Sequence, residues 1–444
     1  MLFRSPWIRS GFQTSRWRVS GYYDRRKGRM LSLSAGNTIF DDSMKLHGEA
    51  QRGFEYAAGR GRLVAGGAFR YERADTRDDA GTSTILRDVH QARSGAVYGQ
   101  VDHALTTPLR VVVAARFDDG TLHGPQLSPK AALVYAISPA QRMRVTYGHA
   151  FQTASFVQYF TRVSAAPSLR LGAIEAALAP ALGGVALKLD NVPILALGND
   201  RLNVERMDSF ETGYSGMFGG KVLIGADYYF NRVTDLITAL LPQVGTSLGR
   251  INPQFAAYQP PSGLSAAQQR LVLANLRAAL RPSLFATMSN DLDGAPIFAV
   301  ASYTNFSRVN LQGAEFNVQY FPNVRVRADV GFSWMDFATQ KEFPEEPVSA
   351  NAPPRSLRLG LSYADARKTA AFSYRRSDRF TWTGGIFRGQ VPSYGVGDLA
   401  ISYKLTPRTR VSVNVANLFD NKHYEIFGGD ILRRSALLTL ARDW

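Results

Sequence analysis

The sequence predicts an all-β protein whose antiparallel strands form a transmembrane β-barrel. Alternation is clearest over residues 324–334, where Val326 and Val330 share one face while Arg325 and Arg327 share the other. A dry protein core does not accept unpaired charges, whereas a barrel with an apolar outside and a polar lumen suits both faces. An arginine that faces lipid at mid-membrane costs about 2–4 kcal/mol, so the arginine face is expected to line the lumen.

The lengths of the connections support the same fold. Short turns alternate along the chain with long polar connections, an asymmetry typical of outer-membrane barrels. The short turns lie at Thr107-Pro108, Ser138-Pro139, Gly219-Gly220, Phe321-Pro322-Asn323 and Thr406-Pro407. We count about 16 to 18 strands, which falls within the range of such barrels.

Each strand is predicted from alternating side chains that lie between turn residues. Residues 1–40 are expected to form short strands, with Gly28 at the turn of a hairpin. Further strands are predicted at 44–57, 62–73, 94–105, 109–118, 130–137, 141–149, 222–231, 314–320, 324–334, 357–363, 408–419 and 431–444. In a closed barrel the last of these would pair with a strand from the other end of the sheet.

Two insertions, residues 150–205 and 242–298, are expected to form long external loops. Ser265 to Leu280 is predicted to be a short helix, since Ser265 can cap its start and Pro282 ends it. Long structured loops over a barrel commonly carry binding residues. The candidate ligand-binding residues are aromatic and basic side chains of the two insertions: Phe151, Phe156, Tyr159, Arg250, Arg270 and Arg277.

A basic, aromatic mouth would attract an anionic ligand, because opposite charge steers the encounter and aromatic rings supply contact area. Two alternatives stay open. The aromatic side chains could simply pack between a loop and the barrel rim, and the arginines could face anionic lipopolysaccharide at the membrane surface.

The composition narrows the class of partner. The chain has 52 Lys and Arg residues against 36 Asp and Glu, a net charge of +16. The basic residues are spread along the chain, often at alternate positions within strands, and form no cluster of the kind that binds nucleic acid. Cysteine is absent, and no run of about 18 apolar residues is present that could form a transmembrane helix. The N-terminus lacks the apolar segment of a signal peptide, so the chain is expected to be a fragment.

No catalytic, cofactor or metal site is predicted, and we expect the protein not to be an enzyme. None of the six histidines has metal-ligand spacing with another histidine or carboxylate. Asp227 and Glu211 lie on predicted lumen faces, where charge pairing with arginines is their ordinary role, and no nucleophile–base grouping accompanies them.

Several motifs carry a resemblance to a known family. They occur in the order LSPKAALVY, RVTYGHAFQTASFVQYF, RLNVERMDSFETGY, DYYFNRVTDLI, YTNFSRVNLQGAEFNVQYFP and VNVANLFDNKHYE. Together with a final strand that ends on an aromatic residue, this series resembles the β-barrel of TonB-dependent outer-membrane receptors over residues 1–444. One departure is Arg442, where that family favours a bulky apolar residue.

The resemblance implies a receptor that imports a scarce large ligand, such as a ferric siderophore or cobalamin, through the bacterial outer membrane. It implies contact with outer-membrane lipid and lipopolysaccharide, and with a TonB-type energy-transducing complex through an N-terminal region that is missing here. Relatives have more strands and a plug domain inside the barrel, so the sheet is expected either not to close or to close imperfectly, with an exposed edge on its N-terminal side. A passive porin-like channel is the alternative function.

Overall fold

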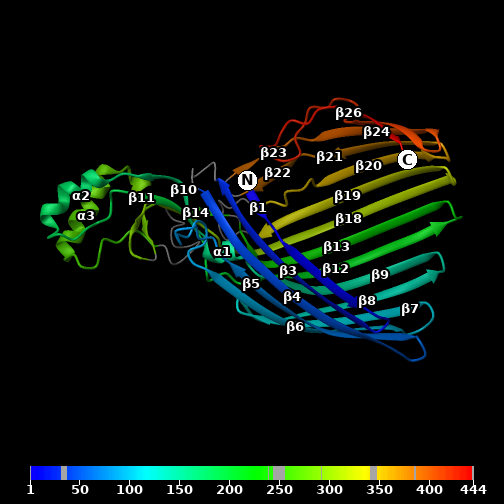
Figure 1. The fold of residues 1–444 in the computed structure, drawn as a ribbon, viewed down its shortest axis with the longest axis horizontal. Helices are drawn as coiled ribbons and strands as arrows, with labels where there is room; N and C mark the ends of the chain where they lie inside the picture. The colour runs from blue at the N-terminus through cyan, green and yellow to red at the C-terminus, as the bar shows by residue number, and fades with distance from the viewer. Residues whose placement is uncertain are drawn as a thin grey trace.

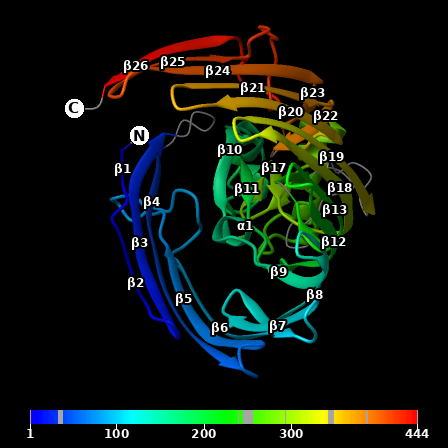
Figure 2. The same cartoon turned by 90° about the vertical axis from the view of Figure 1, so that its right-hand side faces the viewer.

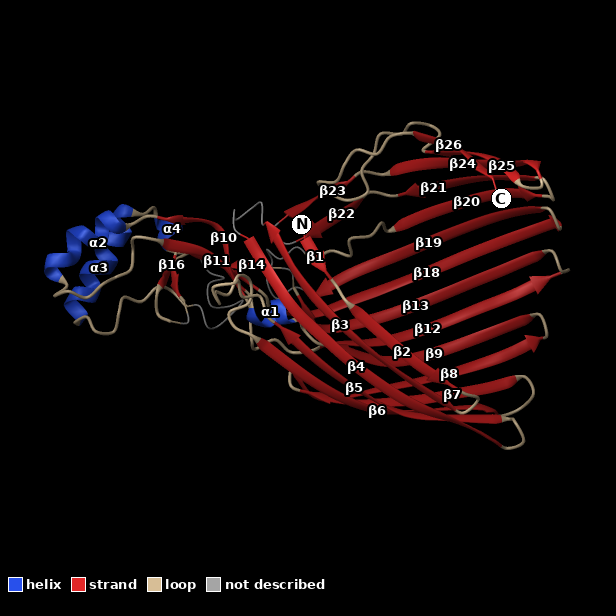
Figure 3. Ribbon diagram, viewed as in Figure 1, coloured by secondary structure: helices blue, strands red, loops and turns tan. Residues whose placement is uncertain are grey.

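The computed structural model describes residues 2–31, 38–238, 240–243, 256–291, 293–340, 348–384 and 387–442. One large antiparallel sheet of 18 strands curls into a ring, and smaller elements extend from one end of it (Figures 1 and 3). Alternating apolar and polar side chains build this ring, because each strand can then present one face to lipid and the other to the lumen.

Pairing follows chain order around the ring. The strands are β1 (Leu2–Arg4), β2 (Trp7–Gln13), β3 (Trp17–Leu31), β4 (Thr38–Tyr56), β5 (Gly61–Ala74), β6 (His90–Ala104), β7 (Leu109–Gly120), β8 (His123–Ser138), β9 (Gln141–Gln152), β12 (Glu205–Phe218), β13 (Val222–Ile237), β18 (Asn305–Asn323), β19 (Val326–Gln340), β20 (Arg355–Ala364), β21 (Lys368–Ser377), β24 (Tyr394–Thr406), β25 (Thr409–Ala416) and β26 (Ser435–Arg442). Because β1 and β2 pair with separate parts of β3, they share one position of the sheet. The predicted antiparallel fold and its number of strands are confirmed.

The polar faces point into the ring. The short helix α1 (Phe156–Phe160) lies inside it (Figure 2), and the pocket beside α1 is lined by Asp24, Lys45 and Glu72 from β3, β4 and β5. Residues paired across neighbouring strands lie on the same face of the sheet. When the pairing is followed from β5 to β19, Arg327 of β19 lies on the same face as Glu72. The apolar parity therefore faces outward, as predicted.

Ion pairs neutralise part of the inner face. Arg144 Nη2 lies 2.8 Å from Asp227 Oδ1, and Arg110 Nη1 lies 2.6 Å from Asp102 Oδ1. Asp227 thus has the pairing role expected for a lumen carboxylate. Both pairs are partly exposed, so each contributes little to stability.

The two ends of the ring differ. Most connections at one end, which we call the turn end, are short, as between β24 and β25 at residues 407–408. The opposite end, the loop end, carries the long connections. One exception is the link between β7 and β8, where only Thr121 and Leu122 separate two strands at the loop end.

The hairpin predicted at Gly28 is wrong. β3 runs without interruption from Trp17 to Leu31 and pairs with β4 along its whole length, and Gly28 lies opposite Asp41. A glycine alone does not end a strand. Here β4 pairs with β3 on both sides of Gly28, so the strand continues through it.

β2 and β26 are the two edges of the sheet and lie on the same side of the ring (Figure 2). Every side chain of both strands is exposed. Leu437 and Leu438 of β26, which point to opposite faces, are 62% and 71% exposed. Within the described residues no pairing joins β26 to β1 or β2, so the sheet is open, as expected.

The insertions differ from their predicted bounds and content. They run from 153 to 204 and from 238 to 304, because β9 extends into the first predicted range, whereas β13 ends before the second predicted range begins and β18 starts after it ends. Both contain helices, whereas the sequence predicted only one. Their elements are α1 (Phe156–Phe160), β10 (Arg162–Leu169), α2 (Gly172–Leu178), η1 (Ala179–Ala181), β11 (Val192–Leu197), β14 (Leu241–Gln243), α3 (Ala266–Ala279), α4 (Pro282–Phe285), β15 (Ser289–Asn290), β16 (Pro296–Ile297) and β17 (Ala299–Ser302). A hairpin of β22 (Phe380–Gly384) and β23 (Phe387–Val391) also lies at the loop end.

Candidate ligand-binding mouth and cap

The two insertions fold together into one unit, which we call the cap: residues 162–197 and the described residues of 241–302. Its strands form a four-stranded sheet in the order β10, β11, β17 and β14, in which β11 from the first insertion pairs with β17 from the second. Figure 1 shows α2 and α3 projecting beyond the loop end of the barrel.

The cap has its own hydrophobic core, to which both insertions contribute. The buried side chains of this core are Leu171, Leu178, Leu182, Leu187, Leu189, Val192, Tyr258, Leu264, Val272, Leu276, Leu280, Met288 and Phe298. Neither insertion can bury this surface alone, because each supplies only part of the contacts. Burial of apolar area is the main favourable term in folding, so the two insertions stabilise each other.

Two side chains near its start cap helix α3. The Ser265 hydroxyl accepts from the Gln268 backbone N–H, and the Gln268 side chain accepts from the Ser265 N–H, which together satisfy two N-terminal donors. The same Gln268 amide donates to the Ala181 carbonyl at 2.8 Å and so links α3 to the first insertion. The predicted helix and its cap are confirmed.

Polar contacts join the two insertions near the base of the cap. Arg162 Nη2 lies 2.5 Å from Asp291 Oδ2, and the Asp291 side chain is only 4% exposed. The Asn199 amide donates to the Tyr303 carbonyl at 2.9 Å. Both contacts join the first insertion to the second, at the point where the cap leaves the barrel.

Helix α1 is anchored at the mouth of the barrel. Ser155 and Gln158 form a capping box at its start. The buried Tyr159 hydroxyl donates to the Leu122 carbonyl at 3.0 Å, and burial raises the pKa of this phenol. Gly198 packs so closely that a Cβ there would lie 2.3 Å from the Tyr159 carbonyl oxygen. The helix is therefore held in one position.

Aromatic rings surround α1. Phe160 stacks on His90 with ring centroids 3.7 Å apart, and Phe156 lies 6.5 Å from the same histidine. Phe151, near the end of β9, lies 5.1 Å from the ring of His123. Phe151 and Phe156 are half-buried, which leaves part of each ring open at the mouth.

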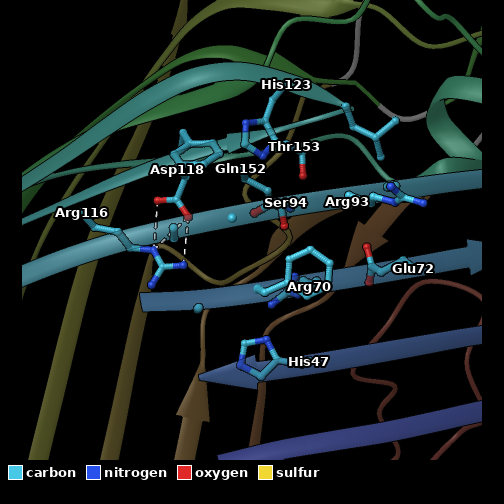
Figure 4. Close-up of a pocket in the computed structure, with 17 residues that line it drawn as sticks. His47, Arg70, Glu72, Arg93, Ser94, Arg116, Asp118, His123, Gln152 and Thr153 are labelled. Carbon is cyan, nitrogen blue, oxygen red and sulfur yellow. Dashed lines mark hydrogen bonds and ion pairs between the residues drawn. The ribbon is translucent and has the colours of Figure 1, made fainter. Parts of the chain in front are cut away.

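A polar pocket of about 290 Å³ lies in the barrel wall next to this mouth (Figure 4). Arg116 Nη2 lies 2.9 Å from Asp118 Oδ1, and Glu72 pairs with Lys45 at 3.1 Å. Arg70 lines the same pocket and makes no ion pair within the described residues. Arg93 also lines this pocket and makes no ion pair within the described residues, so the wall offers two guanidinium groups whose charges are not neutralised.

The geometry suits noncovalent binding. In the part of the chain that the structure describes, no group of three His, Cys, Asp or Glu side chains is arranged to hold a metal ion. The clustered groups here are cations, paired charges and ring faces, which recognise a ligand by charge, hydrogen bonds and contact area.

The predicted binding residues fall into two separate groups. Phe151, Phe156 and Tyr159 meet at the mouth around α1, although Tyr159 is buried. Arg270 and Arg277 are exposed on α3, in the projecting part of the cap, so the structure does not bring them to the aromatic group (Figure 1). Arg250 lies outside the described residues.

The comparisons with known proteins decide the family. A family model described as "TonB dependent receptor-like, beta-barrel" matches residues 3–418. The chain belongs to the TonB-dependent receptor family. Proteins of this family reside in the outer membrane and serve as transport receptors. None of the described helices is long and apolar enough to cross a membrane.

Solved structures agree on the fold of this receptor barrel. The siderophore receptor PirA from Acinetobacter baumannii has a TM-score of 0.64 and 16% identity, with 95% of this chain and 58% of that chain covered. A mutant of the ferric enterobactin receptor PfeA from Pseudomonas aeruginosa has a TM-score of 0.63 and 13% identity, with 95% of this chain and 56% of that chain covered. The FrpB iron transporter from Neisseria meningitidis has a TM-score of 0.61 and 13% identity, with 96% of this chain and 59% of that chain covered.

This receptor barrel therefore spans somewhat under two thirds of the length of these structures. A comparison with curated protein sequences found no match.

Sequence reasoning missed several residues of this receptor barrel's mouth. Arg70, Arg116 and Asp118 lie on the lumen parity of their strands, which the alternation does reveal. Their gathering near His123 depends on how far each strand extends at the loop end, and the pattern of side chains does not give that distance.

Proposed function

We propose that the protein takes up a scarce large ligand across the outer membrane, such as a ferric siderophore or cobalamin, with energy supplied by a TonB-type complex. The observation that carries this proposal is the cap, a folded unit with its own core, built from two insertions, that projects from the loop end of the barrel. A passive pore has no need of such a structure, whereas a receptor needs a surface that captures its ligand before transport.

The charges of the cap favour an anionic ligand. Residues 266–281 contain Arg270, Arg277 and Arg281 and no carboxylate, and all three arginines are exposed. Because they lie away from the mouth, we propose that they attract the ligand first. Phe151 and Phe156 would then contact it at the mouth, where ring faces supply contact area.

The proposal includes no covalent chemistry, so the protein acts as a receptor and not as an enzyme. The outward apolar face would contact outer-membrane lipid and lipopolysaccharide. Energy coupling would reach the barrel through a TonB-type partner, and the loop end would face outside.

Uptake of radiolabelled ferric chelates tests the proposal, with the gene at its native locus and compared with its deletion. We expect uptake that requires the gene and stops when the proton gradient is collapsed. Gene-dependent uptake that continues without the gradient would favour the passive channel instead.

A charge reversal tests the role of the arginines. The double variant Arg270→Glu with Arg277→Glu is expected to weaken binding of an anionic ferric chelate about tenfold or more, in line with electrostatic steering. The control is Arg408→Glu at the turn end. Equal binding by the two variants would remove the arginines from the proposal.

A further inference from the structure

A second pocket lies beside α1, and its chemistry differs from that of the cap. It has a volume of about 450 Å³, within the range of small-molecule sites. Helix α1, the inner faces of β3, β4 and β5, and the connection after β5 enclose it. Its apolar lining includes Met30, Ile39, Ile85, Leu86, Phe156 and Val157.

Two of these apolar side chains are not covered by the protein. Val157 is 44% exposed and Met30 is 38% exposed, although Leu86 nearby is almost fully buried. An occupant that covers them would gain free energy from removing apolar area from water. Because Tyr159 and the capping box hold α1 in place, the pocket does not need to form on binding.

The charges that line the pocket leave one carboxylate without a cation of its own. Arg26 lies 3.9 Å from Asp41, and Lys45 lies 3.1 Å from Glu72. Asp24 forms no ion pair within the described residues and accepts only a hydrogen bond from the Ser5 hydroxyl at 3.2 Å. Arg73 also borders the pocket, but its guanidinium pairs with Asp75. The lining thus holds three carboxylates and three cations, and Asp24 is the carboxylate among them that has no ion pair within the described residues.

We propose that this pocket binds an apolar part of the imported ligand that carries a positive charge, with Asp24 as the partner of that charge. The inference rests on the proposed uptake function and adds a second contact of opposite character. The arginines of α3 meet negative groups, and the pocket beside α1 selects an apolar, cationic group. A ligand with both features would be recognised at two separate places.

Cysteine labelling tests this selectivity without any transport measurement, because the chain contains no cysteine. Val157→Cys places a thiol in the pocket. Leu284→Cys places one on α4 at a matched exposure of 42%, beside the arginines of the cap. Isolated outer membranes would be treated with methanethiosulfonate reagents that carry either a trimethylammonium or a sulfonate group.

The expected result is a preference for the cationic reagent that is about threefold or more higher at Val157→Cys than at Leu284→Cys, since nearby charges change the local concentration of each reagent. Adding Asp24→Asn should remove this difference. Benzyltrimethylammonium should slow labelling of Val157→Cys, and benzenesulfonate should not.

Three outcomes would overturn the proposal: equal preference at the two thiols, a preference unchanged by Asp24→Asn, or no reaction of Val157→Cys with either reagent, which would mean that protein fills the pocket. None of these outcomes depends on uptake. Loss of uptake with selectivity intact would count against the transport function alone.

Discussion

Replacing Leu276 with alanine tests whether the two insertions truly depend on each other. Leu276 lies on α3 in the second insertion, is fully buried, and belongs to the core that the first insertion shares. Removing a buried leucine side chain costs about 2–5 kcal/mol, because contacts are lost and a cavity remains. A loss of about 3 kcal/mol corresponds to roughly a hundredfold change in an opening equilibrium.

Leu271 provides a matched control on the same helix. It is 40% exposed, so Leu271→Ala makes the same chemical change at the surface and should cost well under about 1 kcal/mol. Both variants have the same helix propensity, since both exchange leucine for alanine. Any difference between them reports burial.

Hydrogen exchange of the backbone amides is the assay, with peptides from both insertions followed separately. In Leu276→Ala, residues 171–192 of the first insertion should exchange roughly a hundredfold faster, although the substitution lies in the second insertion. The strands of the barrel should be unaffected. Faster exchange confined to α3, or equal behaviour of Leu276→Ala and Leu271→Ala, would refute the shared core.

Three further predictions concern the mouth, the loop after β5 and the sheet edges. Gly198→Ala should dislodge α1, because the added Cβ would clash with the backbone carbonyl of Tyr159. A Cβ at Gly263 meets nothing within 4 Å, so Gly263→Ala should leave the structure unchanged. The measurement is the rate of protease cleavage near α1, which should rise only in Gly198→Ala. The hydrogen bond from the Arg77 side chain lowers the pKa of Asp75 from 3.8 to about 2. The lowered pKa of Asp75 therefore contributes about 2 kcal/mol of stability, which is present above pH 4 and is lost as the pH falls towards 2. Asp75→Asn should abolish this pH dependence in the thermal stability of the loop. Since the outer sides of β2 and β26 have no partner strand among the described residues, the chain expressed alone should insert poorly and show no heat-modifiable migration on a gel, and a heat-modifiable band would contradict this.

The alternation of side chains predicted most of the barrel, because each strand has one face in lipid and one in the lumen. The run around Val330 gave the correct outward face, and Ser265 and Pro282 gave the correct bounds of α3. These features depend on local physical chemistry, which a short stretch of sequence contains in full.

The mouth and the cap depend on contacts between distant segments, so the sequence did not reveal them. Helix α1 has five residues, too few for a helical period to show. The pairing of β11 with β17 joins residues about a hundred positions apart, and no local pattern specifies that partner. For the same reason Arg270 and Phe156 could be assigned to binding loops, but their separation could not be foreseen.

β8 illustrates a second limit. The strand was predicted at 130–137, yet it begins at His123 and passes through Gly124, Pro125 and Pro129. These residues are usual strand breakers. In the sheet, Pro129 lies opposite Ala115 of β7, and pairing with the neighbouring strands outweighs the local preference.

The most direct test of the transmembrane receptor topology is labelling of single cysteines in intact cells. Arg270→Cys lies on the cap and Arg408→Cys lies in the turn between β24 and β25, at opposite ends of the barrel, and both positions are exposed. A membrane-impermeant maleimide should label Arg270→Cys in intact cells, and should label Arg408→Cys only after the outer membrane is broken. Labelling of Arg408→Cys but not Arg270→Cys in intact cells, or equal labelling of both, would contradict a barrel that spans the outer membrane with its cap outside.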